Sequence, residues 1–154
     1  MGLSLLEDLG ELIAHNYQNY LTYEQHLRDI PGLRLLRYDE SQRHNYQYVI
    51  VELKETDCAI RRDHLMEILS AENVLARRYF YPGVHRLEPY RSLYPQAGHK
   101  LPETERLVER VLCLPTGSSL HPNQVNTICR IIRTALDNDK DLVARWPFGG
   151  DPGT

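Results

Sequence analysis

Residues 77–94, RRYFYPGVHRLEPYRSLY, concentrate side chains suited to binding a charged ligand that carries a ring. Guanidinium forks hold phosphate groups through paired hydrogen bonds, and aromatic faces stack on rings. The segment therefore predicts a site for a phosphorylated or glycosylated ligand. Packing of tyrosines beside prolines in an ordinary loop is the other interpretation of the same composition. The side chains concerned are Arg77, Arg78, Arg86, Arg91, Tyr79, Tyr81, Tyr90, Tyr94 and His85.

Other chemistry finds little support along the chain. A lone loop histidine such as His85 is more often a surface residue than a catalyst. The remaining histidines show neither HExxH nor any paired metal-ligand spacing, so we expect no metal site. Cys58, Cys113 and Cys129 are an odd number without CxxC spacing, which argues against a disulfide framework. No GxSxG, GxGxxG or P-loop motif occurs, and the residues alone indicate no catalytic residue.

Charge and composition limit the partners. The chain has 154 residues and a net charge of −3, with 18 basic and 21 acidic side chains, so nucleic acid is not an expected partner. Residues 77–110 are locally basic, enough for a small anion, although a solvated arginine face is an equally open interpretation. No apolar run could span a membrane, and the acidic amphipathic start is unlike a secretory signal. We therefore expect a cytoplasmic protein.

The elements that must position these side chains follow from periodicity and punctuation. Apolar residues at helical spacing, a Ser4–Glu7 capping pair and the stop at Pro31-Gly32 predict one long helix over 3–30. Such a helix is longer than a domain of this size needs, which is a first indication that it lies against something else. The expected order after it is strands at 33–38 and 46–53, a helix at 61–73, a strand at 74–77, a loop at 78–101, a helix at 102–111, a strand at 112–115 and a helix from 122.

This order predicts an α+β fold in which helices cover a small, mainly antiparallel sheet, preceded by the long N-terminal helix. We divide the chain into a helix of interdomain type at 1–32, a small domain at 33–140 and a loose tail at 141–154. Arg61 stands where a capping side chain is usual, which weakens the start of the helix at 62–72 by about 1 kcal/mol.

The stretches ENVLARRYFYPGVHRLEPYRSLYP and LPETERLVERVLCLPTGSSLHPNQVNTICRIIR, in this order, closely resemble the C-terminal part of the DegT/DnrJ/EryC1/StrS aminotransferases. The resemblance extends over residues 1–136. It implies the small domain of a fold-type I, pyridoxal-phosphate-dependent enzyme that aminates nucleotide-linked keto sugars. The loop GVHRLEPYRS looks most like members that act on dTDP-linked 4-keto-6-deoxy sugars. By the same resemblance Tyr79, Tyr81 and His85 contact the sugar nucleotide, and Arg77 and Arg78 add charge there.

The family's large domain supplies the Schiff-base lysine and the cofactor cradle, and nothing here resembles them. Lys54, Lys100 and Lys140 are the three lysines, and none lies in a matching motif. We therefore expect no pyridoxal phosphate in this chain alone and no transamination without a large domain or split-gene partner. Self-association through an uncovered apolar helix face is also expected. A free-standing nucleotide-sugar-binding or regulatory module, without catalysis, is the alternative, and a folded remnant without function is a third interpretation.

Overall fold

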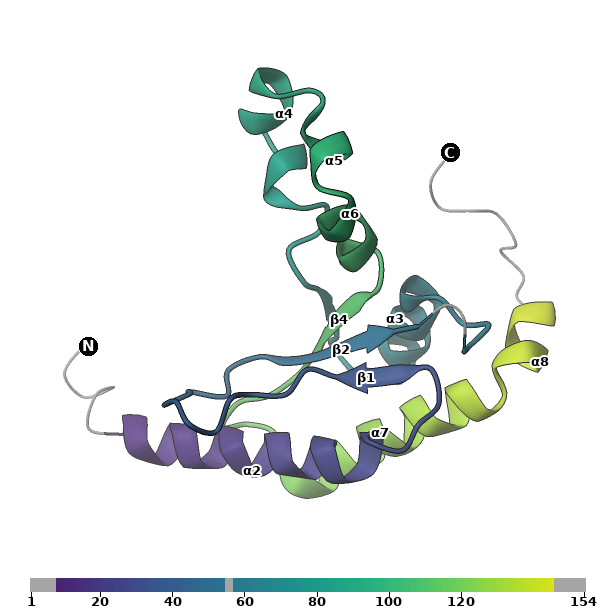
Figure 1. Cartoon of the computed structure of the whole chain (residues 1–154). Coiled ribbons are helices and arrows are strands. Elements are labelled where there is room, and N and C mark those ends of the chain that lie inside the picture. Colours follow the sequence, from purple (N-terminus) through teal and green to yellow (C-terminus); the bar gives the residue numbers. More distant parts are fainter. Residues whose placement is uncertain (1–7, 55–56, 146–154) are drawn as a thin grey trace.

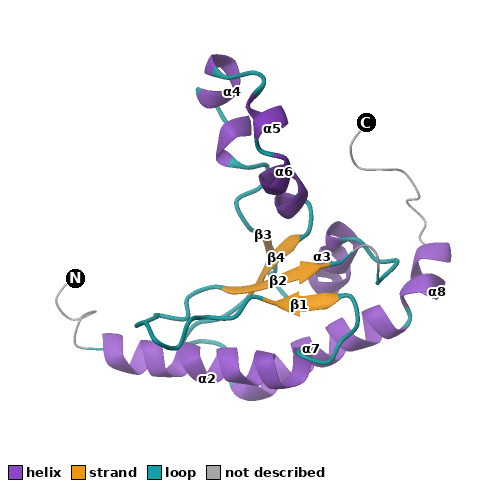
Figure 2. Cartoon of the chain, viewed as in Figure 1, coloured by secondary structure: helices purple, strands orange, loops and turns teal. Residues whose placement is uncertain are grey.

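Four short strands form the sheet around which the chain is arranged (Figures 1 and 2). The structure is a computed structural model, and it describes residues 8–54 and 57–145. All strand pairs are antiparallel and the order across the sheet is β1-β2-β4-β3. The strands are β1 (Leu33–Leu35), β2 (Val49–Leu53), β3 (Arg77–Arg78) and β4 (Val111–Leu114). The expected α+β fold is thus confirmed.

The register gives the sheet one apolar face and one mixed face. Leu35 pairs with Val51, which pairs with Leu112, and all three are buried in the core. Because side chains alternate along a strand, the intervening residues leave the other face. That mixed face carries Arg34, Glu52, Ile50, Val111, Cys113 and Arg77.

Three helices supply the other half of the core: α2 (Leu9–Leu27), α3 (Arg62–Ala71) and α7 (Pro122–Asp137). Helix α7 buries a regular apolar stripe that includes Ile128 and Ile132. Helix α2 lies alongside α7 below the strands in Figure 1 and buries Tyr20 and Tyr23. In α2 only the C-terminal half is apolar and covered, since Leu9 and Leu12 are exposed.

Residues 79–108, here called the arm, leave the sheet after β3 and return to it before β4. They contain η1 (Val84–Arg86), α4 (Tyr90–Leu93), α5 (Ala97–Lys100) and α6 (Pro102–Val108). Figure 1 shows these short helices stacked into a projection that rises away from α2 and α7. Where the sequence predicted a loop at 78–101, the chain therefore forms successive helical turns.

Other expectations need adjustment. Among the described residues the first helix spans Leu9–Leu27 rather than 3–30, and the Ser4–Glu7 pair lies outside them. The strand predicted at 74–77 is instead Arg77–Arg78, because Asn73 takes a left-handed conformation and Val74 returns a hydrogen bond to the end of α3. The segment 141–154, expected as a loose tail, begins inside α8 (Asp139–Ala144), and residues 146–154 lie outside the described part.

Two further features bear on what the sequence predicts. Arg61 stands at the N-cap position of α3 and makes no capping hydrogen bond with its side chain, while the weakening of about 1 kcal/mol stays a prediction. Within 8–54 and 57–145, no helix combines the length and hydropathy required to cross a lipid bilayer.

Candidate functional site

The two arginines of β3 leave opposite faces of the sheet. Arg77 pairs with Cys113 on the mixed face, and Arg78 pairs with the buried Leu112 on the helix-covered side. Arg78 donates from Nε to Oδ1 of Asp63 in α3 at 3.0 Å. Arg77 makes no ion pair with a carboxylate among the residues described. Of the two cations, Arg77 is therefore the one whose charge is left for a ligand.

A pocket of about 580 Å³ opens beside β3, where β4 ends, and we call it the edge pocket. The ring of Tyr79 packs edge-on against Tyr48 with centroids 5.4 Å apart, and Phe80 adjoins it at 4.3 Å. Burial, followed by the neighbouring Tyr48 and Cys113, raises the pKa of Tyr79, so its hydroxyl stays protonated and able to donate. The lining consists of Gln47, Tyr48, Leu75, Arg77, Arg78, Tyr79, Phe80, Cys113, Leu114, Pro115, Thr116 and Ser119.

A second cavity of about 530 Å³, the arm pocket, lies within the arm, and Val111 at the start of β4 also borders it. Its walls are almost wholly apolar or aromatic. Tyr79 lines both pockets, and His85 lines only the second of the two. The arm pocket is bounded by Tyr79, Phe80, Gly83, Val84, His85, Tyr90, Tyr94, Ala97, Leu101, Thr104, Leu107, Val108 and Val111.

His85 is held in place by groups on both sides. Its Nε2 contacts Oε1 of Glu105 in α6. Arg86 donates to both oxygens of the same carboxylate, from Nε to Oε1 at 2.9 Å and from Nη2 to Oε2. Arg86 and then His85 hold the pKa of Glu105 below its usual range, so Glu105 is ionised at neutral pH. Gly83 adopts φ +95°, and a Cβ at that position would lie 2.8 Å from Cε1 of His85. The position therefore requires glycine.

Tyr81 lies apart from both pockets. The guanidinium carbons of Arg62 and Arg78 are 4.9 and 4.8 Å from the centre of its ring, a cation–π arrangement with two partners. Its ring is thus engaged inside the protein, although the side chain remains partly exposed.

The five residues singled out by resemblance therefore fall into three settings. Arg77, Arg78 and Tyr79 border the edge pocket, Tyr79 and His85 border the arm pocket, and Tyr81 stacks between arginines. Sequence reasoning missed three residues that complete these settings: Phe80, Glu105 and Arg62. The sequence also indicates that Tyr46 or Tyr48, from the strand predicted at 46–53, lies near the loop, and Tyr48 does border the edge pocket.

The same residues offer little to a metal ion or to pyridoxal phosphate. No cluster of three potential metal-ligating side chains occurs in the described part of the chain. Lys54, Lys100 and Lys140 are exposed, and none lines the edge or arm pocket. A Schiff-base lysine needs a desolvated or cationic setting that lowers its pKa. The described residues thus do not fit pyridoxal phosphate, and no step through that group is assigned to them.

Comparisons with known proteins agree on one family. A model of the DegT/DnrJ/EryC1/StrS aminotransferase family matches residues 1–133. A dTDP-4-amino-4,6-dideoxy-D-glucose transaminase of Shigella dysenteriae is 29% identical over 132 residues, which are 86% of this chain and 35% of that protein. The chain thus spans about a third of the length of this relative.

Solved structures extend the likeness. The crystal structure of DesI in the presence of its TDP-sugar product is 43% identical, with a TM-score of 0.86 over 94% of this chain and 36% of that one. The aminotransferase TlmJ from Streptoalloteichus hindustanus is 26% identical, with a TM-score of 0.74 over 88% and 35%.

Proposed function

Because the chain belongs to the DegT/DnrJ/EryC1/StrS aminotransferase family, we propose that it is the small-domain part of an enzyme that aminates a nucleotide-linked keto sugar. A dTDP-linked 4-keto-6-deoxyhexose is the proposed substrate. The names of the Shigella transaminase and of DesI with its TDP-sugar product support this choice. The chain's own part is to bind and orient the sugar nucleotide.

The edge pocket carries this proposal. It combines a cation that forms no ion pair within the described ranges, Arg77, with the rings of Tyr48 and Tyr79 at one opening. A diphosphate needs the cation, and a pyrimidine base or a sugar needs a flat apolar surface. The neighbouring hydroxyl groups of Thr116 and Ser119 can hydrogen-bond to the ligand. We infer that the diphosphate lies at Arg77 and that a ring of the ligand lies on Tyr79.

Catalysis is proposed to need more than this chain. The family's chemistry depends on pyridoxal phosphate bound to a lysine, and the described lysines are all exposed. We propose that a large domain, on a partner chain or on further sequence, supplies that site.

The large domain or a second copy of the chain would also cover the apolar surface of the arm. Exposed large apolar residues in the arm are Phe80, Tyr81, Val84, Leu87, Tyr90, Leu93, Tyr94, Leu101 and Leu107. Such an enzyme acts in the cytoplasm, where nucleotide sugars are made.

Titration of the isotope-labelled chain with dTDP, followed by amide NMR, tests the binding proposal. We expect chemical-shift changes at Tyr48, Arg77, Tyr79 and Thr116, and none along α7. Arg106→Gln, which removes an exposed cation in α6, is the matched control and should bind as the original chain does. Absence of shifts at millimolar dTDP, or shifts confined to other surfaces, would contradict the proposal.

A second measurement separates the domain of an enzyme from the non-catalytic binding module. The chain is incubated with pyridoxal phosphate, reduced with borohydride and weighed intact. We expect no stoichiometric adduct from the chain alone, and transamination only after a large domain of the family is added. Binding of dTDP together with no activity beside any such large domain would favour the binding module.

A further inference from the structure

Arg62 is the most deeply buried charged residue of the described chain. Its side chain is 1% exposed, and it occupies the first turn of α3. Removal of a guanidinium from water costs several kcal/mol unless partners replace its hydration. The amino end of a helix also carries positive partial charge, which disfavours a cation there. The residue is therefore kept in place by specific partners.

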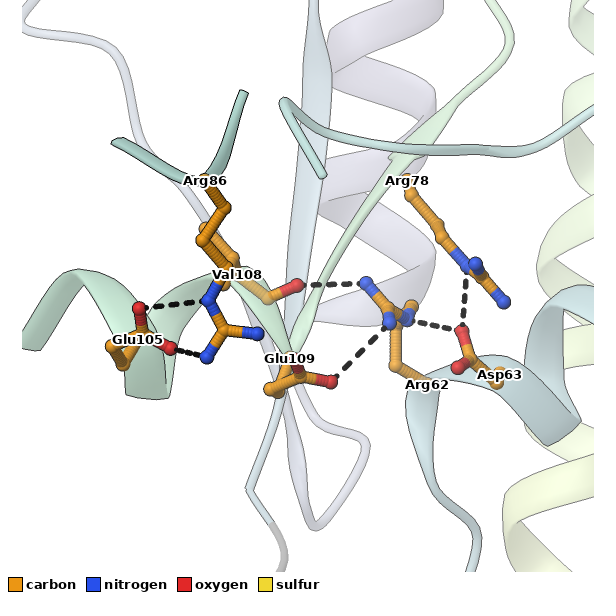
Figure 3. Close-up of polar contacts among 7 residues, drawn as sticks. All are labelled: Arg62, Asp63, Arg78, Arg86, Glu105, Val108 and Glu109. Carbon is orange, nitrogen blue, oxygen red and sulfur yellow. Dashed lines mark hydrogen bonds and ion pairs between the residues drawn. The ribbon is translucent and has the colours of Figure 1, made fainter. Parts of the chain in front are cut away.

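Those partners, Val108 and Glu109, lie where the arm returns to β4, a part that we call its returning leg (Figure 3). Nη1 donates to the carbonyl oxygen of Val108, the last residue of α6, at 2.8 Å, and Nη2 lies 3.7 Å from Oε2 of Glu109. A helix's carboxyl end carries negative partial charge and free carbonyl groups, so a cation is favourable there. The guanidinium of α3 thus caps the arm's last helix.

The part of the arm that follows β3, its outgoing leg, also contacts the guanidinium of Arg62. The ring of Tyr81 lies 4.9 Å from the guanidinium carbon of Arg62. Oδ1 of Asp63 forms ion pairs with both arginines: Nε of Arg62 lies 2.5 Å away, and Nε of Arg78 donates a hydrogen bond at 3.0 Å (Figure 3). One planar group therefore touches both legs of the arm, while α3 itself is anchored in the core through Leu65.

The structure assigns to Arg62 the role of a positioning residue that sets the angle between the arm and the sheet. The inference deepens the proposed function and rests on it, because Tyr79 stands between the edge pocket and the arm pocket. A change in the arm's angle would move Tyr79 relative to Arg77 and Tyr48, which line the edge pocket with it. Arg62 itself lines neither pocket, so its effect on a ligand acts through the arm.

A purely structural role makes a different prediction. Replacement of a buried ion-paired group by an apolar residue of similar size is often neutral for stability. If Arg62 only fills space, Arg62→Met should leave the orientation of the folded arm unchanged. The substitution leaves Asp63 paired with Arg78, and Glu109 is half-exposed, so neither carboxylate is stranded in the core.

Residual dipolar couplings of backbone amides test the assignment. In the original chain, amides of β2, β4 and residues 84–108 should fit one common alignment. In Arg62→Met we expect the couplings of the sheet amides to fit the same alignment tensor as before. The couplings of the arm amides should need a tensor of different orientation or smaller magnitude. The affinity for dTDP should fall about tenfold, since small misplacements of binding groups are costly. Arg106→Met, which removes an ion pair inside α6, should change neither readout.

The outcomes separate the two proposals. Arm couplings in folded Arg62→Met that still fit the sheet's alignment would overturn the positioning role, whatever happens to stability. If the arm amides of Arg62→Met realign but the original chain binds no dTDP, the positioning role is supported and the proposed function is contradicted. If Arg62→Met does not fold, Arg62→Lys replaces it. Lysine keeps the charge but lacks the fork that reaches Val108 and Glu109 together, so arm couplings unchanged by this substitution would also overturn the assignment.

Discussion

Arg77 and Arg78 are adjacent in the chain, yet their side chains belong to opposite faces of the sheet. Arg78 reaches Asp63 at 3.0 Å and the ring of Tyr81 at 4.8 Å, both on the helix-covered side. Arg77 pairs with Cys113 on the mixed face and forms no ion pair among the described residues, while both arginines border the edge pocket. The resemblance gave these residues one shared role, whereas the alternation of a strand separates them.

This separation makes the two arginines a matched pair for mutation. Arg77→Gln should weaken dTDP binding about tenfold, or ~1.4 kcal/mol, because a charge-assisted hydrogen bond to phosphate is lost. The free energy of unfolding should change by less than about 0.5 kcal/mol, as expected for an exposed site. Calorimetry and urea unfolding measure the two quantities. Unchanged affinity in Arg77→Gln would exclude Arg77 from the ligand site.

Arg78→Gln should lower stability more, and weaken dTDP binding less, than Arg77→Gln does. Loss of its contacts with Asp63 and Tyr81 should lower the free energy of unfolding by about 0.5–1 kcal/mol, because the pair is partly exposed. Binding should weaken less than in Arg77→Gln. Equal losses of affinity in the two variants would contradict the division between the faces.

Gly83→Ala tests how the backbone positions His85. The residue has φ +95°, and its new Cβ would lie 2.8 Å from Cε1 of His85. We expect a loss of about 1–3 kcal/mol in the free energy of unfolding, from backbone strain and the displaced imidazole. Urea unfolding measures the loss, and a histidine NMR signal shifted away from its original position shows the displacement. Gly10→Ala is the control, since no atom lies within 4 Å of the added Cβ.

Glu105 should make the arm sensitive to acid. Arg86 and His85 lower its pKa in the folded chain below the ordinary value of 4.5. Its contribution to stability is therefore complete above that ordinary value and is lost as the pH falls through the lowered, folded pKa. The protection factors of arm amides, which correct hydrogen exchange for its slower intrinsic rate in acid, should fall over this range in the original chain.

Glu105→Gln should remove that pH dependence and destabilise the arm at neutral pH. Glu103→Gln, on the exposed face of the same helix, is the control and should keep the original profile. An acid profile that is identical in Glu105→Gln and the original chain would show that this carboxylate does not stabilise the arm.

Cys129 should be the least reactive thiol of the folded chain. Burial in α7 raises its pKa to about 12, so almost none of it is thiolate at physiological pH. Labelling with a maleimide, followed by mass spectrometry, should modify Cys58 and Cys113 well before Cys129, and denaturant should remove the difference. Modification of Cys129 at the rate of Cys58 would show that α7 opens locally.

Several features were readable in the sequence because they depend on near neighbours. The helix predicted from 122 is α7, which buries Val125, Ile128 and Ile132, and the helix predicted at 61–73 is α3, which ends just before the left-handed Asn73. The composition of residues 77–94 identified the segment that borders both pockets. Periodicity and turn chemistry are local properties, so one sequence suffices to find them.

The sequence by itself determined the α+β class, the family and the arginine- and tyrosine-rich segment at 77–94. Only the tertiary structure decided what each of that segment's side chains does. Arg62 and Glu105 lie in the helices predicted at 61–73 and 102–111, and no sequence pattern singled them out. The fold buries Arg62 against both ends of the arm and brings Arg86 and His85 to Glu105. These contacts join residues 19 to 46 positions apart, and burial and charge pairing over such separations depend on the packed fold.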